Sequence, residues 1–525
     1  MSKSPTKITF IWHMHQPCCK YPGKEYYSLP WVRLHGIKDY YGMAKMVDKF
    51  EATKVVFNYS GILLEQLLDY VYNGAKDQYG ELSLKNAADL TVKEKEFIID
   101  RFFSINFEKF IRHNPRYLQL YNKKLSPKLS FSFQDICDLQ AIFNLCWFHP
   151  YSIKEDKYLR SLIGKKKNYT QEDKEYIINA QYDILKKIFP LYQKLIAEKK
   201  IEVTLSPHQH PIMPLVYDTD IIKDTPYLKR PQERFYAPQD CTWHINKARK
   251  LYDKAFGGQA KGSWPPEGGV SEAVASLYAQ EGFKWIAADE TILFKSLVTD
   301  YVPYDMIKNQ RHMVYSPYNF RGVNVLFRDR NFADLISFTY QGWEDPVFAA
   351  TDLLEHFKKT HMYMKELLRE RVITIAMDGD NAWEYYQNNG VEFLETIYTL
   401  IEKSTFLQTD VPSHYLPHVR SKNLDRLASG SWVNGDFGVW IGNVKNNNYW
   451  DILYRIKGVV DKANVSPSVM EKVKEYLHLI EGSDWYWWNT FEDHVGEFKN
   501  IFFAYVAEIF RLLDKKLPSY AKPHQ

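Results

Sequence analysis

The sequence predicts an α/β protein built as a seven-stranded β/α barrel, and three observations support this fold class. Short apolar runs recur along the chain, each ends in polar residues, and helical segments separate most of them. Near-continuous apolar runs are typical of parallel strands that are buried on both faces. The predicted strands cover residues 7–17, 54–60, 201–211, 262–269, 284–290, 324–330 and 372–383.

The segments between the later strands have helical patterns. Residues 271–283 and 351–372 are examples, and the second ends in Arg and Lys residues, which the helix dipole favours in a last turn. A repeated order of strand, helix and parallel strand indicates a barrel. Because catalytic side chains of such barrels lie at the carboxyl ends of the strands, the polar residues that end each run are the candidates for a site.

Two regions interrupt the repeat. Residues 62–199 are charged, aromatic and helical without a strand rhythm, which predicts a helical insertion between the second and third strands. After about residue 403 the strand pattern stops and amphipathic segments follow. We therefore expect a catalytic barrel over residues 1–402 and a C-terminal helical domain over residues 403–525 that contributes to the active-site cleft.

Composition limits the class of function. A chain of 525 residues with 45% hydrophobic and 25% charged residues is typical of soluble globular proteins. The net charge of +4 and the isolated lysine runs argue against nucleic-acid binding, and no apolar run is long enough to span a membrane. The five cysteines form no CxxC framework and the N-terminal residues lack a signal peptide, so we expect a cytoplasmic protein. The aromatic content of 16% favours a carbohydrate site, since aromatic rings stack on sugar faces.

Two H-x-H pairs follow predicted strands. His13 and His15 project from one side of the first strand because side chains alternate along a strand, and His208 and His210 have the same spacing after the third. Four imidazoles at one end of a barrel can bind zinc, donate hydrogen bonds to sugar hydroxyls, or serve only as satisfied polar groups under loops.

Carboxylates distinguish among these kinds of site. Glu267 lies in the turn "WPPEGG", where prolines fix the backbone and glycines allow a close approach, and Asp378 and Asp380 follow the seventh strand. Two carboxylates on opposite sides of a barrel mouth are the pair that glycoside hydrolysis requires. The spacing alone does not choose between Asp378 and Asp380.

Five motifs in order resemble those of glycoside hydrolase family 57, and most closely its α-amylase and amylopullulanase-type members. They are "HMHQP" at 13–17, "EVTLSPHQHPIMPL" at 202–215, "WPPEGGVSE" at 264–272, "AMDGDNAWEYY" at 376–386 and "EGSDWYWW" at 481–488. Two further stretches, "FRDRNFADLISFTYQGW" and "GSWVNGDFGVWIGNVKNNNYWDIL", also resemble that subgroup. The family fold is a seven-stranded β/α barrel with a helical C-terminal domain, which agrees with the strand count made from the residues.

The resemblance implies a role for particular residues. It makes Glu267 the nucleophile and Asp378 the general acid/base of a retaining mechanism, with no metal and no cofactor. One departure is at Asp380, because the family usually has Glu at this position. The implied substrate-binding residues are His13, His15, Gln16, Glu202, His210, Trp264, Asp380, Trp383, Asp484 and Trp485.

The expected activity is therefore cleavage of α-1,4-glucosidic bonds in glycogen, starch or maltooligosaccharides. A 4-α-glucanotransferase, or an amylopullulanase that also cuts α-1,6 bonds, would use the same carboxylates. Alternatives of other classes are a metal-dependent hydrolase that uses the H-x-H pairs and a non-catalytic glucan-binding protein.

Overall fold

The computed structural model describes residues 5–126, 130–491 and 496–522, and it confirms a mixed α/β protein. One mixed sheet contains ten strands, and seven of them correspond to the predicted strands. These seven are β1 (Thr6–Met14), β2 (Val55–Ser60), β3 (Ile201–Ser206), β4 (Gly262–Ser263), β5 (Trp285–Asp289), β7 (Val323–Arg328) and β8 (Val372–Asp378).

The seven strands pair in parallel in the order β4-β5-β7-β8-β1-β2-β3. Every residue of β2, β3 and β5 is buried, as expected for strands covered on both faces. The register sets His13 of β1 beside Asp378 of β8 and beside Asn58 of β2. Polar residues from neighbouring strands therefore lie at one level, at the carboxyl ends of the strands.

The two ends of this strand order, β3 and β4, are joined by serine side chains. The Ser206 hydroxyl donates to the carbonyl oxygen of Trp264 over 2.5 Å, and the Ser263 hydroxyl donates to that of Leu205 over 2.6 Å. A small apolar cluster separate from the main core combines side chains of β1, β2, β5, β7 and β8, among them Val56 and Trp285. The first and last strands of the order thus lie next to each other.

Helices follow the strands and begin at polar residues. Ser271 caps one such helix, while Asp289, which ends β5, and Asp329, which follows β7, accept hydrogen bonds from the first turns of two others. The helices that surround the sheet are α1 (Trp31–His35), α2 (Tyr41–Asp48), α12 (Met213–Tyr217), α13 (Pro238–Phe256), α14 (Glu272–Gln280), α15 (Glu290–Leu297), α16 (Tyr304–Lys308), α17 (Arg330–Asp334), α18 (Pro346–Met364), α19 (Val391–Glu402) and α20 (Pro412–Tyr415).

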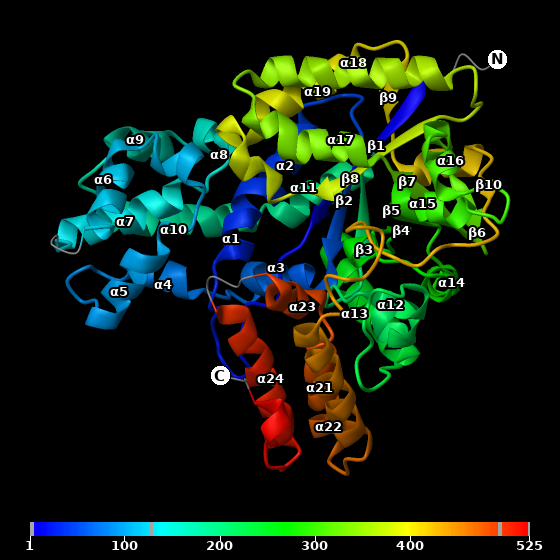
Figure 1. Cartoon of the computed structure of the whole chain (residues 1–525). Coiled ribbons are helices and arrows are strands. Elements are labelled where there is room, and N and C mark those ends of the chain that lie inside the picture. Colours follow the sequence, from blue (N-terminus) through cyan, green and yellow to red (C-terminus); the bar gives the residue numbers. More distant parts are fainter. Residues whose placement is uncertain (1–4, 127–129, 492–495, 523–525) are drawn as a thin grey trace.

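The region between β2 and β3 is helical, as predicted. Most of its helices lie together at one side of the sheet, at the left in Figure 1. Thr91 with Glu94, and Thr170 with Asp173, form capping boxes that start two of them. The helices are α3 (Gly61–Tyr72), α4 (Gln78–Leu84), α5 (Val92–Arg101), α6 (Pro115–Lys124), α7 (Phe133–Leu145), α8 (Pro150–Glu155), α9 (Lys157–Lys165), α10 (Gln171–Leu185) and α11 (Ile188–Ala197).

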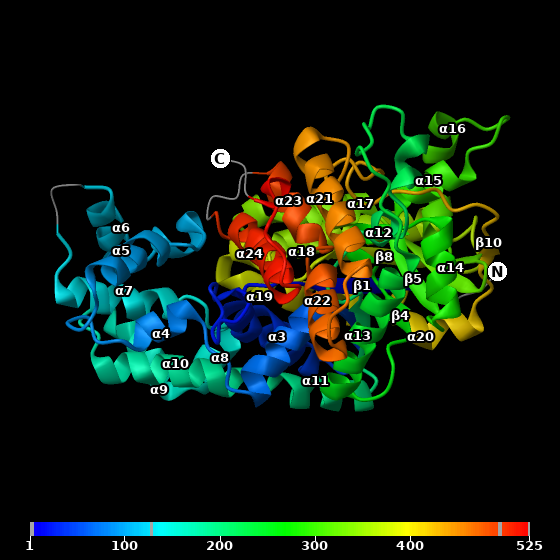
Figure 2. The ribbon, with the colours of Figure 1, turned by 90° about the horizontal axis from the view of Figure 1, so that it is seen from below.

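The expectation that strands stop at residue 403 is wrong in detail. Two short strands follow, β9 (Leu407–Thr409), which pairs with β1, and β10 (Lys422–Asn423), which pairs with the equally unpredicted β6 (Tyr318–Phe320). Only then come the long C-terminal helices, which lie side by side below the sheet and next to α3 and α13 (Figures 1 and 2). They are α21 (Val444–Asp461), α22 (Pro467–Leu479), α23 (Ser483–Thr490) and α24 (Glu497–Leu512).

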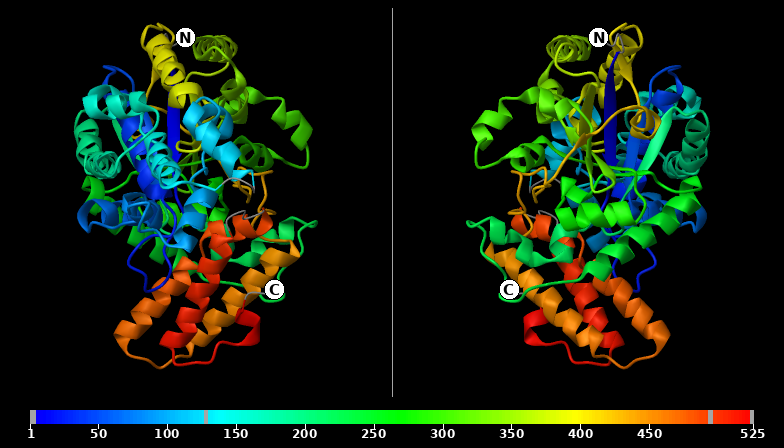
Figure 3. Two further views of the ribbon diagram at one scale, coloured as in Figure 1. Left: turned by 90° about the vertical axis from the view of Figure 1, so that its left-hand side faces the viewer. Right: turned by 90° about the vertical axis from the view of Figure 1, so that its right-hand side faces the viewer.

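The views from the two sides show the C-terminal helices beneath the body that contains the sheet (Figure 3). His244 of α13 is hydrogen-bonded to the fully buried Glu481, which precedes α23, over 2.8 Å. This contact ties the C-terminal helices to a helix of the sheet region. In the described parts of the chain, no helix combines the length and the hydropathy that a membrane span needs.

Candidate active site

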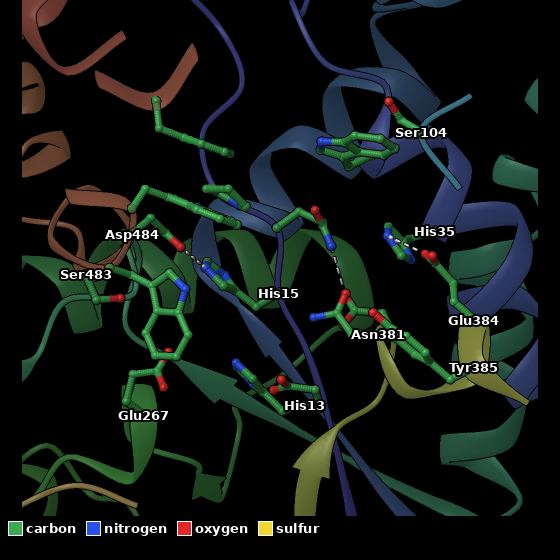
Figure 4. Close-up of a pocket in the computed structure, with 18 of the residues that line it drawn as sticks. His13, His15, His35, Ser104, Glu267, Asn381, Glu384, Tyr385, Ser483 and Asp484 are labelled. Carbon is green, nitrogen blue, oxygen red and sulfur yellow. Dashed lines mark hydrogen bonds and ion pairs between the residues drawn. The ribbon is translucent and has the colours of Figure 1, made fainter. Parts of the chain in front are cut away.

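A cavity with a volume of ≈ 640 Å³ opens at the carboxyl ends of β1 and β8. Figure 4 shows that His13, His15, Glu267 and Asp484 gather on one side of it, and His35, Asn381, Glu384 and Tyr385 on another. Of the residues predicted from the sequence, seven line the cavity: His13, His15, Gln16, Glu267, Asp378, Asp380 and Asp484.

Three histidines form one stacked group at the wall of this cavity. The ring of His15 lies on that of His210 with 3.9 Å between centroids, and His13 Nε2 is 3.0 Å from His210 Nε2. Burial lowers the pKa of His13 to about 3, and it lowers that of His210 well below the usual range. These two imidazoles are therefore neutral at neutral pH, so each has one nitrogen that donates and one that accepts a hydrogen bond.

Hydrogen bonds from the surrounding elements hold this group. His13 Nδ1 is 2.6 Å from the Asn58 side-chain oxygen on β2, and His210 Nδ1 is 3.0 Å from the Ser483 hydroxyl at the start of α23. His15 Nε2 is 3.0 Å from the Asp484 carboxylate. The C-terminal helices thus supply two of the groups that orient the histidines of the sheet.

The same histidines are poorly arranged for a metal ion. One ligand atom from each of His15, His210 and Asp484 lies within 4.8 Å of the others, which is close enough for a shared ion. However, the two imidazole planes are stacked and only 16° apart. The nitrogen lone pairs lie in the ring planes, so those of parallel stacked rings do not converge on one point, as a tetrahedral zinc site requires.

Glu267 is held in an unusual backbone conformation. It lies in a single turn of 3₁₀ helix (Pro266–Gly268) directly after β4, and its φ of 56° is in the left-handed region. Such a conformation is strained for a residue with a Cβ atom and persists only where neighbouring structure holds it. The Trp432 amide donates to the Glu267 carbonyl oxygen over 3.0 Å, and Val270 and Gly430 form an antiparallel bridge beside it.

The two oxygens of the Glu267 side chain have different surroundings. Trp432 Nε1 donates to Oε2 over 2.7 Å, and Oε1 lies 3.9 Å from His210 Nδ1. Burial raises the pKa of Glu267 to about 7, while the hydrogen bond from Trp432 opposes that shift and the charge of Asp484 adds to it.

Asp378 is the last residue of β8 and lines the same cavity. Burial raises the pKa of Asp378 to about 8, and the negative charges of Asp380 and Glu267 act in the same direction. A buried acid that keeps its proton near neutral pH has the property that a general acid needs.

Asp380 is 2% exposed and engages two donors from the sheet region. Its Oδ2 atom accepts hydrogen bonds from Gln16 Nε2 over 3.1 Å and from the Tyr40 hydroxyl over 2.9 Å. Burial raises its pKa and both hydrogen bonds oppose the shift. The structure therefore distinguishes Asp380 from Asp378, which the sequence spacing left equivalent. Among the hydrogen bonds of the described residues, none involves the Asp378 side chain.

Besides His210, four predicted binding residues do not line the cavity. Glu202 lies near the beginning of β3, away from the carboxyl end, and accepts hydrogen bonds from Trp285 and Ser413, so its predicted place beside the histidines is wrong. The other three are almost fully buried tryptophans with structural contacts: Trp264, Trp383 and Trp485. His210 is also outside the lining, but it contacts lining residues directly.

His208 shows why the second H-x-H pair does not behave like the first. Strand β3 ends at Ser206, and His210 has a φ of 53°, so side chains no longer alternate there. His208 Nε2 instead lies 2.8 Å from the Glu65 carboxylate.

Several residues that line the cavity are not predicted from the sequence, because they come from regions far from the strand motifs. The insertion contributes Ser104, Asn106 and Trp147, and the C-terminal part contributes Trp432, Trp487, Trp488 and Phe498. Trp432, Trp487 and Trp488 lie inside quoted motifs, which is the one signal that was present, while nothing in the insertion marks its residues for a role.

Comparison with known proteins decides the family. The model of glycosyl hydrolase family 57 matches residues 9–427, which is most of the chain. The chain belongs to glycosyl hydrolase family 57. It is accordingly a glycosidase-type enzyme, and its cavity is the candidate active site of a family 57 enzyme.

Solved structures of similar fold include other enzymes of this type. A GH57-type branching enzyme from Pyrococcus horikoshii has a TM-score of 0.63 at 15% identity, covering 97% of this chain and 89% of that one. The α-amylase AmyC from Thermotoga maritima has a TM-score of 0.62 at 15% identity, covering 97% and 93%. A 4-α-glucanotransferase from Thermococcus litoralis has a TM-score of 0.52 at 13% identity, covering 97% and 60%. At these identities the likeness concerns the fold alone, and among curated proteins none matches the sequence.

Proposed function

We propose that this family 57 enzyme is a retaining hydrolase that cleaves α-1,4-glucosidic bonds in glycogen, starch or maltooligosaccharides. The observation that carries the proposal is the pair of acids in one cavity, Glu267 and Asp378, whose pKa values are raised to about 7 and about 8. The α-amylase among the structures of similar fold supports the substrate class.

In the proposed mechanism Glu267 is the nucleophile. Its carboxylate attacks the anomeric carbon while Asp378 gives its proton to the leaving glycosidic oxygen, so that the C–O bond breaks as the glycosyl-enzyme bond forms. Asp378, now ionised, then takes a proton from water, whose oxygen attacks the anomeric carbon and releases Glu267. Both acids return to their starting charges, with net retention of configuration.

The environments of the two acids suit these opposite roles. Glu267 receives a hydrogen bond from Trp432, which favours its ionised form, whereas Asp378 faces the negative charges of Glu267 and Asp380. Of two interacting acids, the one with more stabilisation of its anion ionises first. We therefore assign the ionised role to Glu267 and the protonated role to Asp378.

We also propose that the seven parallel strands form a closed barrel, with the catalytic domain in residues 1–402 and the C-terminal domain in residues 403–525. The hydroxyl contacts of Ser206 and Ser263 support closure between β3 and β4, as does the apolar cluster shared by the strands. A cytoplasmic location is proposed as well, because all five cysteines are free. Cell fractionation with detection of the protein would test the location.

Only some of the predicted binding residues retain their role in sugar binding. We propose that His13, His15, Gln16, Asp380 and Asp484 contact the sugar at the cleavage point, because all five line the cavity. His210 orients the other two histidines. Trp264, Trp383 and Trp485 are assigned to packing, since each is 3% exposed or less.

A glucanotransferase is the second candidate. Trp487 and Trp488 of α23, with Trp31 of α1, add aromatic surface to the cavity beyond the two acids. Aromatic rings of this kind can hold an acceptor sugar, which would then compete with water for the glycosyl-enzyme. The branching enzyme and the glucanotransferase of similar fold also favour this candidate.

The decisive experiment compares the wild type with Glu267→Gln and Asp378→Asn on soluble starch and maltooligosaccharides. We expect each variant to lose roughly 10³-fold or more in kcat with its fold intact, because removal of either member of a cooperating pair disables the chemistry. Glu272→Gln is the matched control, since Glu272 pairs with Arg321 on the exposed face of α14. It should retain wild-type activity.

Two results of this experiment would contradict the assignment. Glu267→Gln with more than a tenth of wild-type kcat would remove Glu267 from the role of nucleophile. Products longer than the maltooligosaccharide supplied would favour transfer over hydrolysis.

A further inference from the structure

We propose that Trp432 and Arg328 act together as positioning residues for Glu267. Trp432 fixes the backbone and one carboxylate oxygen of Glu267, and Arg328, which lies over the indole ring, strengthens the hydrogen bond from Trp432 to Glu267. The inference rests on the proposed role of Glu267 as nucleophile. Trp432 lies beyond residue 427, where the match to the family model ends.

The first part of the argument concerns the backbone of the turn. A left-handed conformation is unfavourable for a residue with a side chain, so the turn at Glu267 must be held by neighbouring structure. The segment that holds it is the one that contains Trp432. Val270 and Gly430 exchange backbone hydrogen bonds of 2.9 and 3.1 Å, and the Trp432 amide donates to the Glu267 carbonyl oxygen.

The second part concerns the carboxylate. The indole Nε1 of Trp432 is 2.7 Å from Oε2, which is short for an N–H donor and typical of a charged acceptor. With Oε2 engaged, Oε1 is the oxygen left to attack, and it lies on the His210 side of the carboxyl group. A donor to one oxygen of a buried carboxylate also favours the ionised form that the nucleophile needs.

The third part concerns the face of the indole. The Arg328 guanidinium carbon lies 4.8 Å from the centroid of the Trp432 ring, so the two form a cation–π pair. Arg328 is 6% exposed, which leaves this interaction little screened by water. A cation over an indole draws electron density from the ring, which makes the N–H a stronger donor to Glu267.

Arg328 is itself held in place at the end of β7. Its Nε donates to Asp289 Oδ2 over 2.8 Å, and one terminal nitrogen donates to the carbonyl oxygen of Ala376 in β8 over 3.0 Å. These two bonds use the planar fork of arginine, which lysine lacks. The chain of contacts thus runs from Asp289 through Arg328 and Trp432 to Glu267.

The test uses Trp432→Phe, which keeps an aromatic ring over Arg328 and removes the N–H donor. We expect kcat to fall about 10- to 100-fold, the range for loss of one charge-assisted hydrogen bond at a reacting group. The KM should change less than about threefold. The acid limb of the kcat profile should move to higher pH, because Glu267 without its donor binds a proton more tightly.

Arg328→Met tests the relay itself. It should lower kcat and move the acid limb in the same direction as Trp432→Phe, and the effects of the two changes should be less than multiplicative when they are combined. Trp243→Phe is the matched control, because Trp243 stacks on His478 and does not line the cavity. It should leave both kcat and the acid limb unchanged.

The outcomes separate this inference from the proposed function. If the wild type has no glucan activity, or if Glu267→Gln remains active, the proposed function fails. If the wild type is active on glucans and Glu267→Gln is inactive, but Trp432→Phe keeps the wild-type kcat and acid limb, only the positioning role is overturned. A fall in kcat with a lower melting temperature and an unmoved acid limb also overturns it, since that pattern indicates a structural residue.

Discussion

Glu267 must be ionised and Asp378 protonated at the same pH, although burial raises the pKa of both. The difference between them comes from their neighbours, because Trp432 donates to Glu267 while Asp380 and Glu267 place negative charge near Asp378. One proton shared between two such acids leaves a window of pH in which the enzyme is active.

The pH dependence of activity follows from these shifts. We expect a bell-shaped profile of kcat/KM that rises as Glu267 ionises near pH 7 and falls as Asp378 loses its proton near pH 8. The two limbs belong to the coupled pair, so activity should be greatest between them. Initial rates on a maltooligosaccharide would be measured in buffers of constant ionic strength from about pH 5 to about pH 10, a range that includes the pKa values of both acids.

The control for this prediction is Asp380→Asn, which removes a negative charge near Asp378 and should move the basic limb to lower pH. An optimum near pH 5 would contradict the prediction, because both acids would then have ordinary pKa values.

At the scale of elements, the strands of five residues or more could be predicted from sequence, whereas of the shorter strands only β4 was predicted. The sequences of strands β2, β3, β5, β7 and β8 are recognisable as apolar runs, because both faces of these strands are buried. Strands β6, β9 and β10 have three residues or fewer, too few for any period to appear in the sequence. Their pairing is decided by contacts with distant segments.

The ends of the strands were predicted too long where turns follow. Residues 262–269 read as one strand, but β4 stops at Ser263, because Pro265 and Pro266 lack the N–H groups that a strand ladder needs. That early stop is also what turns Glu267 out of the sheet. The sequence placed His13 and Asp378 at the cavity correctly because these residues lie at the ends of strands. It placed His208 wrongly because the alternation of side chains does not continue beyond Ser206, where β3 ends.

The contacts between β3 and β4 predict a specific loss of stability. Ser206→Ala and Ser263→Ala each leave a buried carbonyl oxygen without its donor, which costs about 1 to 3 kcal/mol. Urea unfolding should show the lower midpoint with an unchanged slope.

Ser276→Ala is the control for these variants, since the Ser276 hydroxyl only donates within helix α14. Its free energy of unfolding should change by less than about 0.5 kcal/mol. Equal effects in all three variants would contradict a special role for the serine contacts between β3 and β4.

At the scale of the whole molecule, three regions far apart in sequence build one cavity. The sheet supplies the acids and histidines, the insertion supplies residues such as Trp147, and the C-terminal helices supply Asp484 and Trp487. The sequence predicted the helical nature of both added regions, but which of their side chains face the acids depends on how the regions pack. That packing has no local signal.

The share of the C-terminal helices in substrate binding can be measured with Trp487→Ala. Loss of one stacking surface should raise the KM for soluble starch about tenfold, with kcat within about threefold of wild type, because the ring contacts sugar away from the reacting bond. Tyr301→Ala is the control, since Tyr301 is 93% exposed and outside the cavity. A large fall in kcat with unchanged KM would instead place Trp487 next to the reacting atoms.

The hold of the Trp432 segment on the turn at Glu267 also has a consequence for synthesis of the chain on the ribosome. A nascent chain that ends before residue 430 already contains all seven parallel strands and both acids, yet it lacks the segment that keeps Glu267 in its strained conformation. The partner of His15, Asp484, is made later still. We therefore expect the acids to remain without their final geometry until the chain has been translated beyond Asp484.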